Sequence, residues 1–520
     1  MSRILTMRLN RNLPPLAVLL LSSTLIACNS SSDDKSAKIE GYVDSVATLD
    51  FQSFNAQENA LEAKGLRVFG PNADLAADLE PEYVTVSADS TTAWVSLQEN
   101  NGIAKVDLLS ATITDIFPLG FKDHGAAGNE LDASDKDDDA VILRSFPNLK
   151  GMYQPDGIAS FEQDGVTYIV SANEGDAREY DGFVEESRVE DITLNASAFP
   201  DAATLQDETI LGRLNITQNL TSAVTQSTPY TTLNSYGARS FSIWNGETGA
   251  LVFDSGSDLA KQAVTAGVYP DGRSDSKGTE PENVAIGTVA GKRLAFIGLE
   301  RANAVAVYDI SDLSDVTFVE MLTHADDVAP EGILFISADD SPNELATLIV
   351  SNEVSGSITI YEADADGKFG TNTGRLVLVG GEAAAEISAY DKTTKRLFVL
   401  NNGEDLTASQ VDVIDISDTA NPVLESSIST STLGGGINSV AVSNGLLAVA
   451  IQADEKTDAG KVAIYDTDTL SLIDSAVVGA LPDMVTFSKD GTMIITADEG
   501  EPNDDYSIDP IGSVSIIRLK

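Results

Sequence analysis

Side chains that commonly hold zinc or act as catalytic bases are scarce in this sequence. Its 520 residues include one cysteine and two histidines, His124 and His324. A zinc site built from several histidines is therefore excluded. A serine–histidine triad is disfavoured by the same shortage.

Positive charge is also scarce. The sequence has 32 lysines and arginines against 81 aspartates and glutamates, a formal net charge of −49. So acidic a surface repels nucleic acid and anionic lipid, and its natural partners are cations or cationic groups. Solvation in a salty environment explains much of the charge equally well. The hydrophobic content of 42% supports a large core and excludes a disordered acidic chain.

Long apolar runs are missing too. The first one, Leu16 to Leu21, is too short for a transmembrane helix of ~20 residues, and no later segment qualifies. Three arginines precede it and small residues follow it, which is the layout of a secretory signal peptide.

The only cysteine, Cys28, ends the stretch LIAC, which resembles the bacterial lipobox. The sequence therefore predicts a signal peptide over 1–27, lipidation of Cys28 and a polar tether over 28–40. Export fits a mature chain with no other thiol. Asn29 in place of aspartate favours the outer membrane, by resemblance to known sorting rules. We expect a cell-envelope protein that contacts the membrane through lipid only.

One unit of three or four short strands recurs along the chain. Its strands alternate apolar and polar residues and are rich in β-branched side chains, as in AWVSLQEN and MIITADEG. The first strand of each unit begins at an acid or amide, and in five units that residue follows a proline. These residues are Glu82, Asp156, Glu282, Glu331, Glu386, Asn438 and Asp483.

The spacing of the units predicts the architecture. Four of the six intervals are 45 to 55 residues, the length of a four-stranded propeller blade. Seven units predict an all-β, seven-bladed β-propeller over 41–520. The longer intervals imply insertions near 120–153, 175–237 and 257–279, all on one face. The last unit lacks a fourth strand, so the segment 45–54 is expected to complete it and close the ring.

Propeller geometry brings acids together. The start of each first strand and the end of each second strand lie at the same face, so two layers of acid should surround one channel mouth. The second layer comprises Glu99, Glu174, Glu300, Glu353, Glu404, Asp454 or Glu455, and Glu499.

So many carboxylates cannot all ionise close together without compensating cations. Oxygen ligands favour Ca²⁺, with Mg²⁺ or another divalent metal as alternatives. The predicted metal ligands are Glu82, Asp156, Glu174, Glu282, Glu300, Glu331, Glu353, Glu386, Asp483 and Glu499. The competing interpretation is that these acids cap strand ends.

A weaker cation site is suggested within the first insertion. Asp135, Asp137 and Asp139 resemble the start of a calcium loop. Ala140 stands where such a loop needs glycine, so a solvated acidic loop is an equal alternative.

Basic residues are few on the predicted acidic face, so each of them is a candidate for a functional role. Arg178, Arg301, Arg273 and Lys277 fall on its loops or strand ends. Arginine beside metal-bound carboxylates is what a phosphate-ester site uses. Glu174, Glu300, Arg178 and Arg301 are therefore the candidate catalytic residues, with plain ion pairing as the alternative.

Several long stretches resemble the choice-of-anchor I family of bacterial exported proteins. They are SANEGDAREY, KGTEPENVAIG, PEGILFI, SNEVSGSITIYE and the segment 481–517. The resemblance implies a propeller on a cell-surface anchor and brings no agreed catalytic residues. Members are often labelled alkaline-phosphatase-like.

Two functions remain open. The first is a surface propeller that binds Ca²⁺ and, through it, a ligand or partner. The second is a metal-dependent phosphoesterase on the same acidic face. The sequence favours the first narrowly, because it has no evident nucleophile, although metal-bound water could serve.

Overall fold

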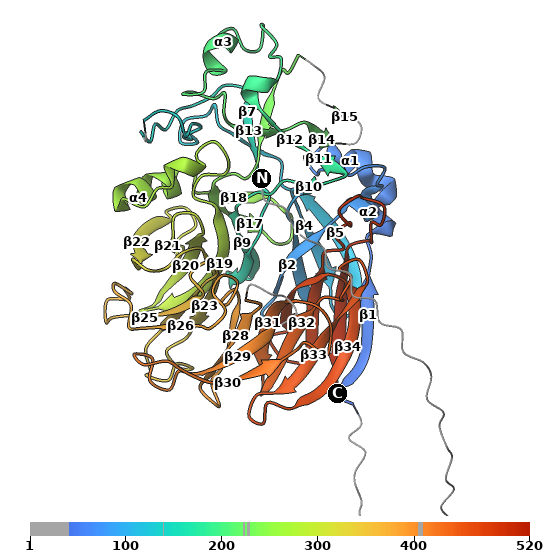
Figure 1. The fold of residues 1–520 in the computed structure, drawn as a ribbon, viewed down its shortest axis with the longest axis vertical. Coiled ribbons are helices and arrows are strands. Elements are labelled where there is room, and N and C mark those ends of the chain that lie inside the picture. Colours follow the sequence, from blue (N-terminus) through green and yellow to red (C-terminus); the bar gives the residue numbers. More distant parts are fainter. Residues whose placement is uncertain (1–40, 139, 222–223, 226–228, 404–408) are drawn as a thin grey trace, which may run out of the picture. The chain divides into compact units, whose positions relative to one another are not determined.

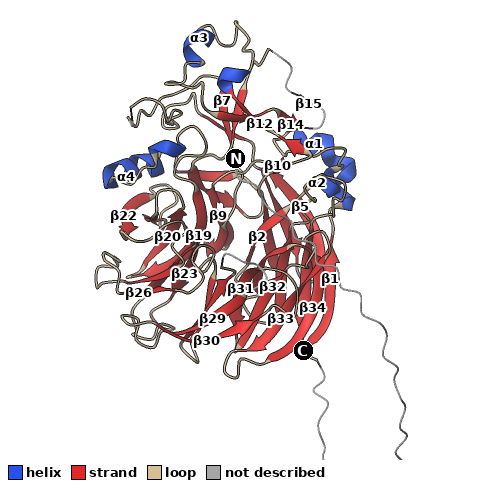
Figure 2. Ribbon diagram, viewed as in Figure 1, coloured by secondary structure: helices blue, strands red, loops and turns tan. Residues whose placement is uncertain are grey.

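The fold is all-β in a computed structural model of the chain, which describes residues 41–520 apart from 139, 222–223, 226–228 and 404–408 (Figures 1 and 2). The predicted signal peptide 1–27, the tether 28–40 with Cys28, Asp139 and Glu404 lie outside the described residues. Within the described part, no helix is long and apolar enough to cross a membrane.

Seven four-stranded antiparallel sheets contain most of the described strands. The first three sheets contain β2 (Pro81–Val86), β3 (Thr92–Leu97), β4 (Gly102–Asp107) and β5 (Thr112–Pro118); β8 (Ile158–Gln163), β9 (Val166–Asn173), β17 (Ser240–Asn245) and β18 (Leu251–Asp254); and β19 (Pro281–Val289), β20 (Lys292–Leu299), β21 (Ala304–Asp309) and β22 (Thr317–Thr323).

The remaining sheets follow in chain order. They contain β23 (Pro330–Ile336), β24 (Thr347–Asn352), β25 (Ser357–Glu362) and β26 (Gly374–Val377); β27 (Ser388–Asp391), β28 (Arg396–Asn401), β29 (Gln410–Asp415) and β30 (Val423–Ser429); β31 (Ile437–Ser443), β32 (Leu446–Ile451), β33 (Ala459–Asp466) and β34 (Leu472–Ala480); and β35 (Pro482–Phe487), β36 (Met493–Asp498), β37 (Ser513–Leu519) and β1 (Val43–Leu49).

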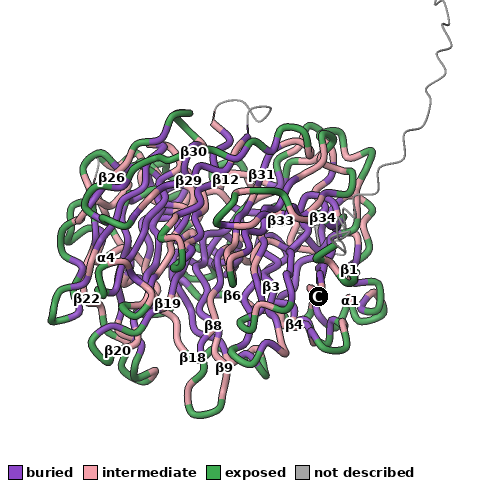
Figure 3. Tube along the Cα trace, turned by 90° about the horizontal axis from the view of Figure 1, so that it is seen from below, coloured by how far each residue is buried: buried purple, intermediate pink, exposed green. Residues whose placement is uncertain are grey.

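The first strands of the sheets lie next to one another. In sequence order, β2, β8, β19, β23, β27, β31 and β35 each contact the next, and β35 contacts β2. Apolar side chains fill the space between neighbouring sheets, since single clusters draw buried residues from two sheets at a time. The buried strands run through the middle of the described part and the exposed turns lie around it (Figure 3).

The last sheet takes its outer strand from the start of the described chain. β1 pairs antiparallel with β37, with Ala47 opposite Ile516 and Leu49 opposite Val514. The predicted strand over 45–54 therefore starts two residues earlier and ends five residues earlier than expected. The Asp50 carboxylate accepts a hydrogen bond from the Gln52 amide, and the chain turns there into the helices η1 (Gln52–Gln57) and α1 (Glu58–Glu62).

The insertions fold together instead of forming separate loops. The first contributes β6 (Phe121–Asp123) and β7 (Leu149–Met152). The second contributes β10 (Glu179–Tyr180), β11 (Phe183–Val184), β12 (Glu186–Arg188), η2 (Val189–Asp191), α3 (Ala202–Leu205), β13 (Asn215–Thr217), β14 (Asn219–Thr221), β15 (Val224–Thr225) and β16 (Leu233–Ser235). β7 pairs with both β6 and β16, and the two insertions share one apolar cluster around Leu149, Val189 and Phe199.

Three further helical segments complete the description. α4 (Asp258–Ala266) and η3 (Asp271–Arg273) belong to the third insertion. α2 (Leu75–Asp78) leads into β2, and the Asp74 carboxylate caps it by accepting a hydrogen bond from the Ala77 amide.

Candidate metal centre

Six of the seven residues that begin the first strands line one cavity of about 200 Å³. They are Glu82, Asp156, Glu282, Glu331, Asn438 and Asp483. At five of the seven first strands the pairing register shifts within the opening residues, as between Pro281 and Val284. A bulge at that point turns the side chain toward the axis, and proline is tolerated there because no ladder hydrogen bond is lost.

Glu386 is the seventh first-strand residue, and it does not line this cavity. Its strand β27 begins two residues later, at Ser388, and Ile387 lines the cavity instead. Burial, followed by the charge of Glu353, raises the pKa of Glu386 to about 8. Glu386 and Glu353 therefore lie beside the cavity and still share its excess of acid.

Four acids of the predicted second layer are buried around the same mouth, whereas Glu353 is half-buried and Asp454 and Glu455 are exposed, contrary to the prediction for that blade. Glu174 and Glu300 are less than a tenth exposed, as are Glu99 and Glu499. Two glycines fix the position of Glu174. A Cβ atom at Gly237, where φ is +66°, would lie 1.9 Å from the Glu174 carbonyl oxygen, and Gly175 packs equally closely against Gly237.

Two groups of three carboxylates come close enough to hold a metal ion. Asp156, Glu174 and Glu282 form the first group, and Glu174, Glu280 and Glu300 form the second. In each group, one oxygen from every member lies within 4.8 Å of the others. Ca²⁺ binds oxygen at about 2.3–2.6 Å, so oxygens across one ion lie up to ~5 Å apart, and both groups fit that size.

The protonation of these acids reflects their crowding. Burial and the charge of Glu174 raise the pKa of Asp156 well above its ordinary value, and the same two causes act on Glu282. The pKa of Asp483 rises to about 7, by burial and then by the charge of Glu501. Carboxyl groups with raised pKa values bind protons at neutral pH unless a cation is near. Protons and cations therefore compete for the carboxylates of the mouth.

Other oxygen atoms of the cavity wall lack hydrogen-bond partners within the described residues. They are Glu282 Oε2, Asn283 Oδ1 and Ser439 Oγ. Asn283 is only 4% exposed and Ser439 only 2%, so bulk water does not compensate them. Buried oxygens normally find a donor or a cation, so these three mark the cavity as a place for a polar occupant.

The second group differs because lysine and arginine side chains already neutralise it. Lys277 Nζ forms ion pairs with Glu174 and Glu280. Arg273 Nε lies 2.7 Å from Glu280 Oε1, and Arg301 Nη1 lies 3.0 Å from Glu300 Oε1. Burial raises the pKa of Glu280, but the charges of these cations outweigh it and lower the pKa overall.

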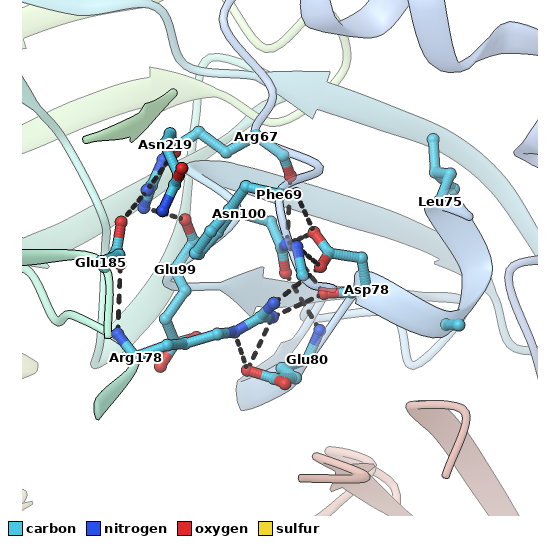
Figure 4. Close-up of polar contacts among 12 residues, drawn as sticks. Arg67, Phe69, Leu75, Asp78, Glu80, Glu99, Asn100, Arg178, Glu185 and Asn219 are labelled. Atoms are coloured by element: carbon cyan, nitrogen blue, oxygen red, sulfur yellow. Dashed lines mark hydrogen bonds and ion pairs between the residues drawn. The ribbon is translucent and has the colours of Figure 1, made fainter. Parts of the chain in front are cut away.

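Arg178 does not face the cavity as a free cation. Its guanidinium is buried, and it lies 2.7 Å from Asp78 and 2.8 Å from Glu80 (Figure 4). It also stacks on Phe69, which the buried Arg67 contacts as well, and Arg67 is paired with Glu185. This network joins the second insertion to the segment before β2, so its role is to hold the insertion.

The weaker loop site has a different environment from the mouth. Asp135 is ion-paired with Arg213 and Lys136, and Arg213 also contacts Asp275 in the third insertion. One oxygen of Asp137 is buried without a described partner, and Asp139 lies outside the described residues. Asp135 therefore links the first insertion to the second by an ion pair.

Several residues of the site escaped the sequence reasoning. Glu280 and Glu80 each stand two residues before a predicted ligand, in the repeated tripeptide Glu-Pro-Glu, and each pairs with buried or half-buried arginine. That repeat was a usable signal. Asn283 and Tyr83, which hydrogen-bond across the cavity floor, carry no such signal.

Comparison with known proteins gives a family match over most of the sequence. The choice-of-anchor I domain matches residues 30–313 and 386–520. A mesenchyme-specific cell surface glycoprotein of Strongylocentrotus purpuratus is 25% identical over 373 residues, which are 61% of this chain and 46% of that protein. Gigasin-3a of Magallana gigas is 23% identical over 189 residues, 30% of this chain and 66% of its own length. This chain thus spans less than two thirds of either relative.

Solved structures with a similar course of the chain have low sequence identity. Hydrazine synthase of Kuenenia stuttgartiensis has a TM-score of 0.47 at 14% identity, and covers 86% of this chain and 98% of its own. The WD40 repeats of RRP9 have a TM-score of 0.42 at 11% identity, with 88% and 98% covered.

Proposed function

The chain belongs to the choice-of-anchor I family, and from that premise we propose that it is a cell-surface β-propeller whose acidic channel mouth binds a divalent cation, Ca²⁺ foremost, and presents it to a ligand or partner. The scaffold of the proposal is a closed, seven-bladed propeller. Support comes from the seven four-stranded sheets, from the contacts that return from β35 to β2, and from the pairing of β1 with β37.

One observation carries the proposal of a cation. Asp156, Glu174 and Glu282 converge to within 4.8 Å, although burial and mutual repulsion oppose their ionisation. A divalent ion removes that cost, because it supplies two positive charges at the point where the three carboxylates meet. The unpartnered oxygens of Asn283 and Ser439 are further neutral oxygen ligands in the same cavity wall.

Calorimetric titration of metal-stripped protein with Ca²⁺ tests this function. We expect saturable binding that is abolished in Asp156→Asn and Glu282→Gln. The matched control is Glu247→Gln, which neutralises an acid that is 61% exposed and paired with Lys105. Only weak binding that salt screens, equal in the control and the site variants, would show that the acids act as a solvation device.

Phosphoester hydrolysis is the second candidate, and Arg301 is the observation that favours it. Its side chain is 41% exposed beside Glu300, so it can still receive an anion. The test is turnover of a phosphate monoester by the calcium-loaded protein. Hydrolysis that disappears in Arg301→Gln, with calcium binding intact, would establish catalysis; no turnover leaves the binding function.

Lipid attachment at Cys28 is part of the proposal, as is an outer-membrane location. The lipobox-like stretch and the membership of a family named for its varied anchors support it. Labelling with a fatty acid should be lost in Cys28→Ala, and fractionation should then find the protein in the soluble fraction. Labelling that persists in this variant would contradict the assignment.

A further inference from the structure

Glu174 belongs to both carboxylate groups of the channel mouth, and a cation of the protein already contacts it. Lys277 Nζ pairs with Glu174 Oε1 and lies 3.5 Å from Glu280 Oε2. It also lies 3.7 Å from Asp176 Oδ1. The Lys277 side chain is only 14% exposed, so its ammonium is withdrawn from solvent into the second group.

Within the described residues, the first group meets a basic side chain only through its shared member, Glu174, which pairs with Lys277. Among the described residues, no ion pair joins Asp156 or Glu282 to a lysine, arginine or histidine, and Glu282 Oε2 has no hydrogen-bond partner. The second group, by contrast, contacts three basic side chains: Lys277, Arg273 and Arg301. The two groups therefore have similar geometry but unequal charge compensation.

We propose that the mouth contains two cation positions that share Glu174, and that the Lys277 ammonium fills the second as a tethered cation. Lys277 thereby limits the mouth to one divalent ion, held by Asp156, Glu174 and Glu282. The inference rests on the proposed function for the first position. For the second position it rests on the seating of Lys277 between Glu174 and Glu280.

The chemistry of the two occupants supports this assignment. An ammonium and a calcium ion both satisfy carboxylate oxygens, but the ammonium brings one charge and is attached to the chain. Lysine is protonated at neutral pH, and the carboxylates of Glu174, Asp176 and Glu280 all lie within ion-pair distance of the Lys277 ammonium. The lysine therefore stays charged at neutral pH and repels a second metal ion.

Removing the tethered cation should open the second position. Metal-stripped full-length protein is titrated with Ca²⁺ by calorimetry, and we expect one site in the wild type and two in Lys277→Met. The matched control is Lys456→Met, which removes a lysine that pairs with Glu501 outside both groups and should keep one site. Lys277→Arg, which retains the charge, should also keep one site. Lys277→Gln replaces the methionine variant if that variant does not fold.

Second substitutions then assign each ion. In the Lys277→Met background, Glu300→Gln should remove only the added site and Glu282→Gln only the original one, because Glu300 and Glu282 each belong to one group. One site in folded Lys277→Met overturns the inference. A wild type without any site, beside a Lys277→Met variant with one site that needs Glu300, refutes the proposed function and retains the tethered cation. If neither the folded wild type nor folded Lys277→Met binds Ca²⁺, both the proposed function and the tethered cation are refuted.

Discussion

Replacement of Arg178 by methionine should be strongly destabilising because it leaves a buried acid without a partner. Arg178 donates two contacts to Glu80, at 3.0 Å and 2.8 Å, and Glu80 is 2% exposed. Asp78 is better protected, since it also accepts hydrogen bonds from the Phe69 and Gly70 amides. Loss of one partner of a buried ion pair costs about 3–5 kcal/mol.

The cost should depend on pH, with a definite sign. Burial already raises the pKa of Glu80 well above its ordinary value, against the opposing charge of Arg178. Without Arg178, folded Glu80 holds its proton over a wider range than unfolded Glu80 does. Stability of the variant should therefore fall more steeply than that of the wild type as pH rises from 5 to 8.

Urea denaturation of the metal-stripped protein, followed by fluorescence of the buried Trp94 and Trp244, measures the effect. Arg178→Met with Glu80→Gln should recover at least half of the loss, because the neutral amide needs no counter-ion. Lys292→Met is the control: its side chain is 59% exposed, and its loss should cost less than ~1 kcal/mol. A loss below ~1 kcal/mol for Arg178→Met at pH 8, or no recovery with Glu80→Gln, would refute the reasoning.

Three further outcomes are expected. The free energy of unfolding of the metal-free protein should fall as pH rises from 5 to 8. Asp483 and Glu300 have pKa values of about 7 in the folded chain and about 4 in the unfolded chain, so the folded form binds more protons in this window. Saturating Ca²⁺ should flatten this dependence of stability on pH. Calcium affinity should fall about tenfold or more from pH 8 to pH 6, as protons compete for the same carboxylates, and a pH-independent calorimetric constant would contradict this. Gly237→Ala should cost about 2–4 kcal/mol and weaken calcium binding, since its Cβ would strike the Glu174 carbonyl, whereas Gly272→Ala has open space and should do neither; thermal melts and titration compare the two.

The fold was largely predictable because the repeat has a physical basis. Each first strand starts beside the polar channel and therefore begins with a polar side chain. Prolines before Glu82, Glu282 and Asp483 mark those starts. The insertions were not predictable in detail. Residues such as Leu149 and Val189 are far apart in sequence and share a cluster only because β7 and β16 pair. No local pattern encodes that pairing.

The candidate site was predictable as a location and less so as a set of contacts. The predicted strand ends located the acidic residues at the channel mouth. The partners of each acid depend on insertion geometry, which is why Arg178 turns out to bind Asp78 and Glu80. Glu386 departs from the pattern, since Ile387 lines the cavity in its place.

The pairing of β1 with β37 also has a mechanical consequence. Val43 lies opposite Leu519, and the Lys520 amide donates to the Tyr42 carbonyl, whereas Leu49 lies opposite Val514, near Asp498 at the acidic end of the sheet. The chain therefore enters this sheet at the end remote from the acidic mouth. A tension applied through the residues before Gly41 would load the edge of the last sheet in shear, along a full row of strand hydrogen bonds.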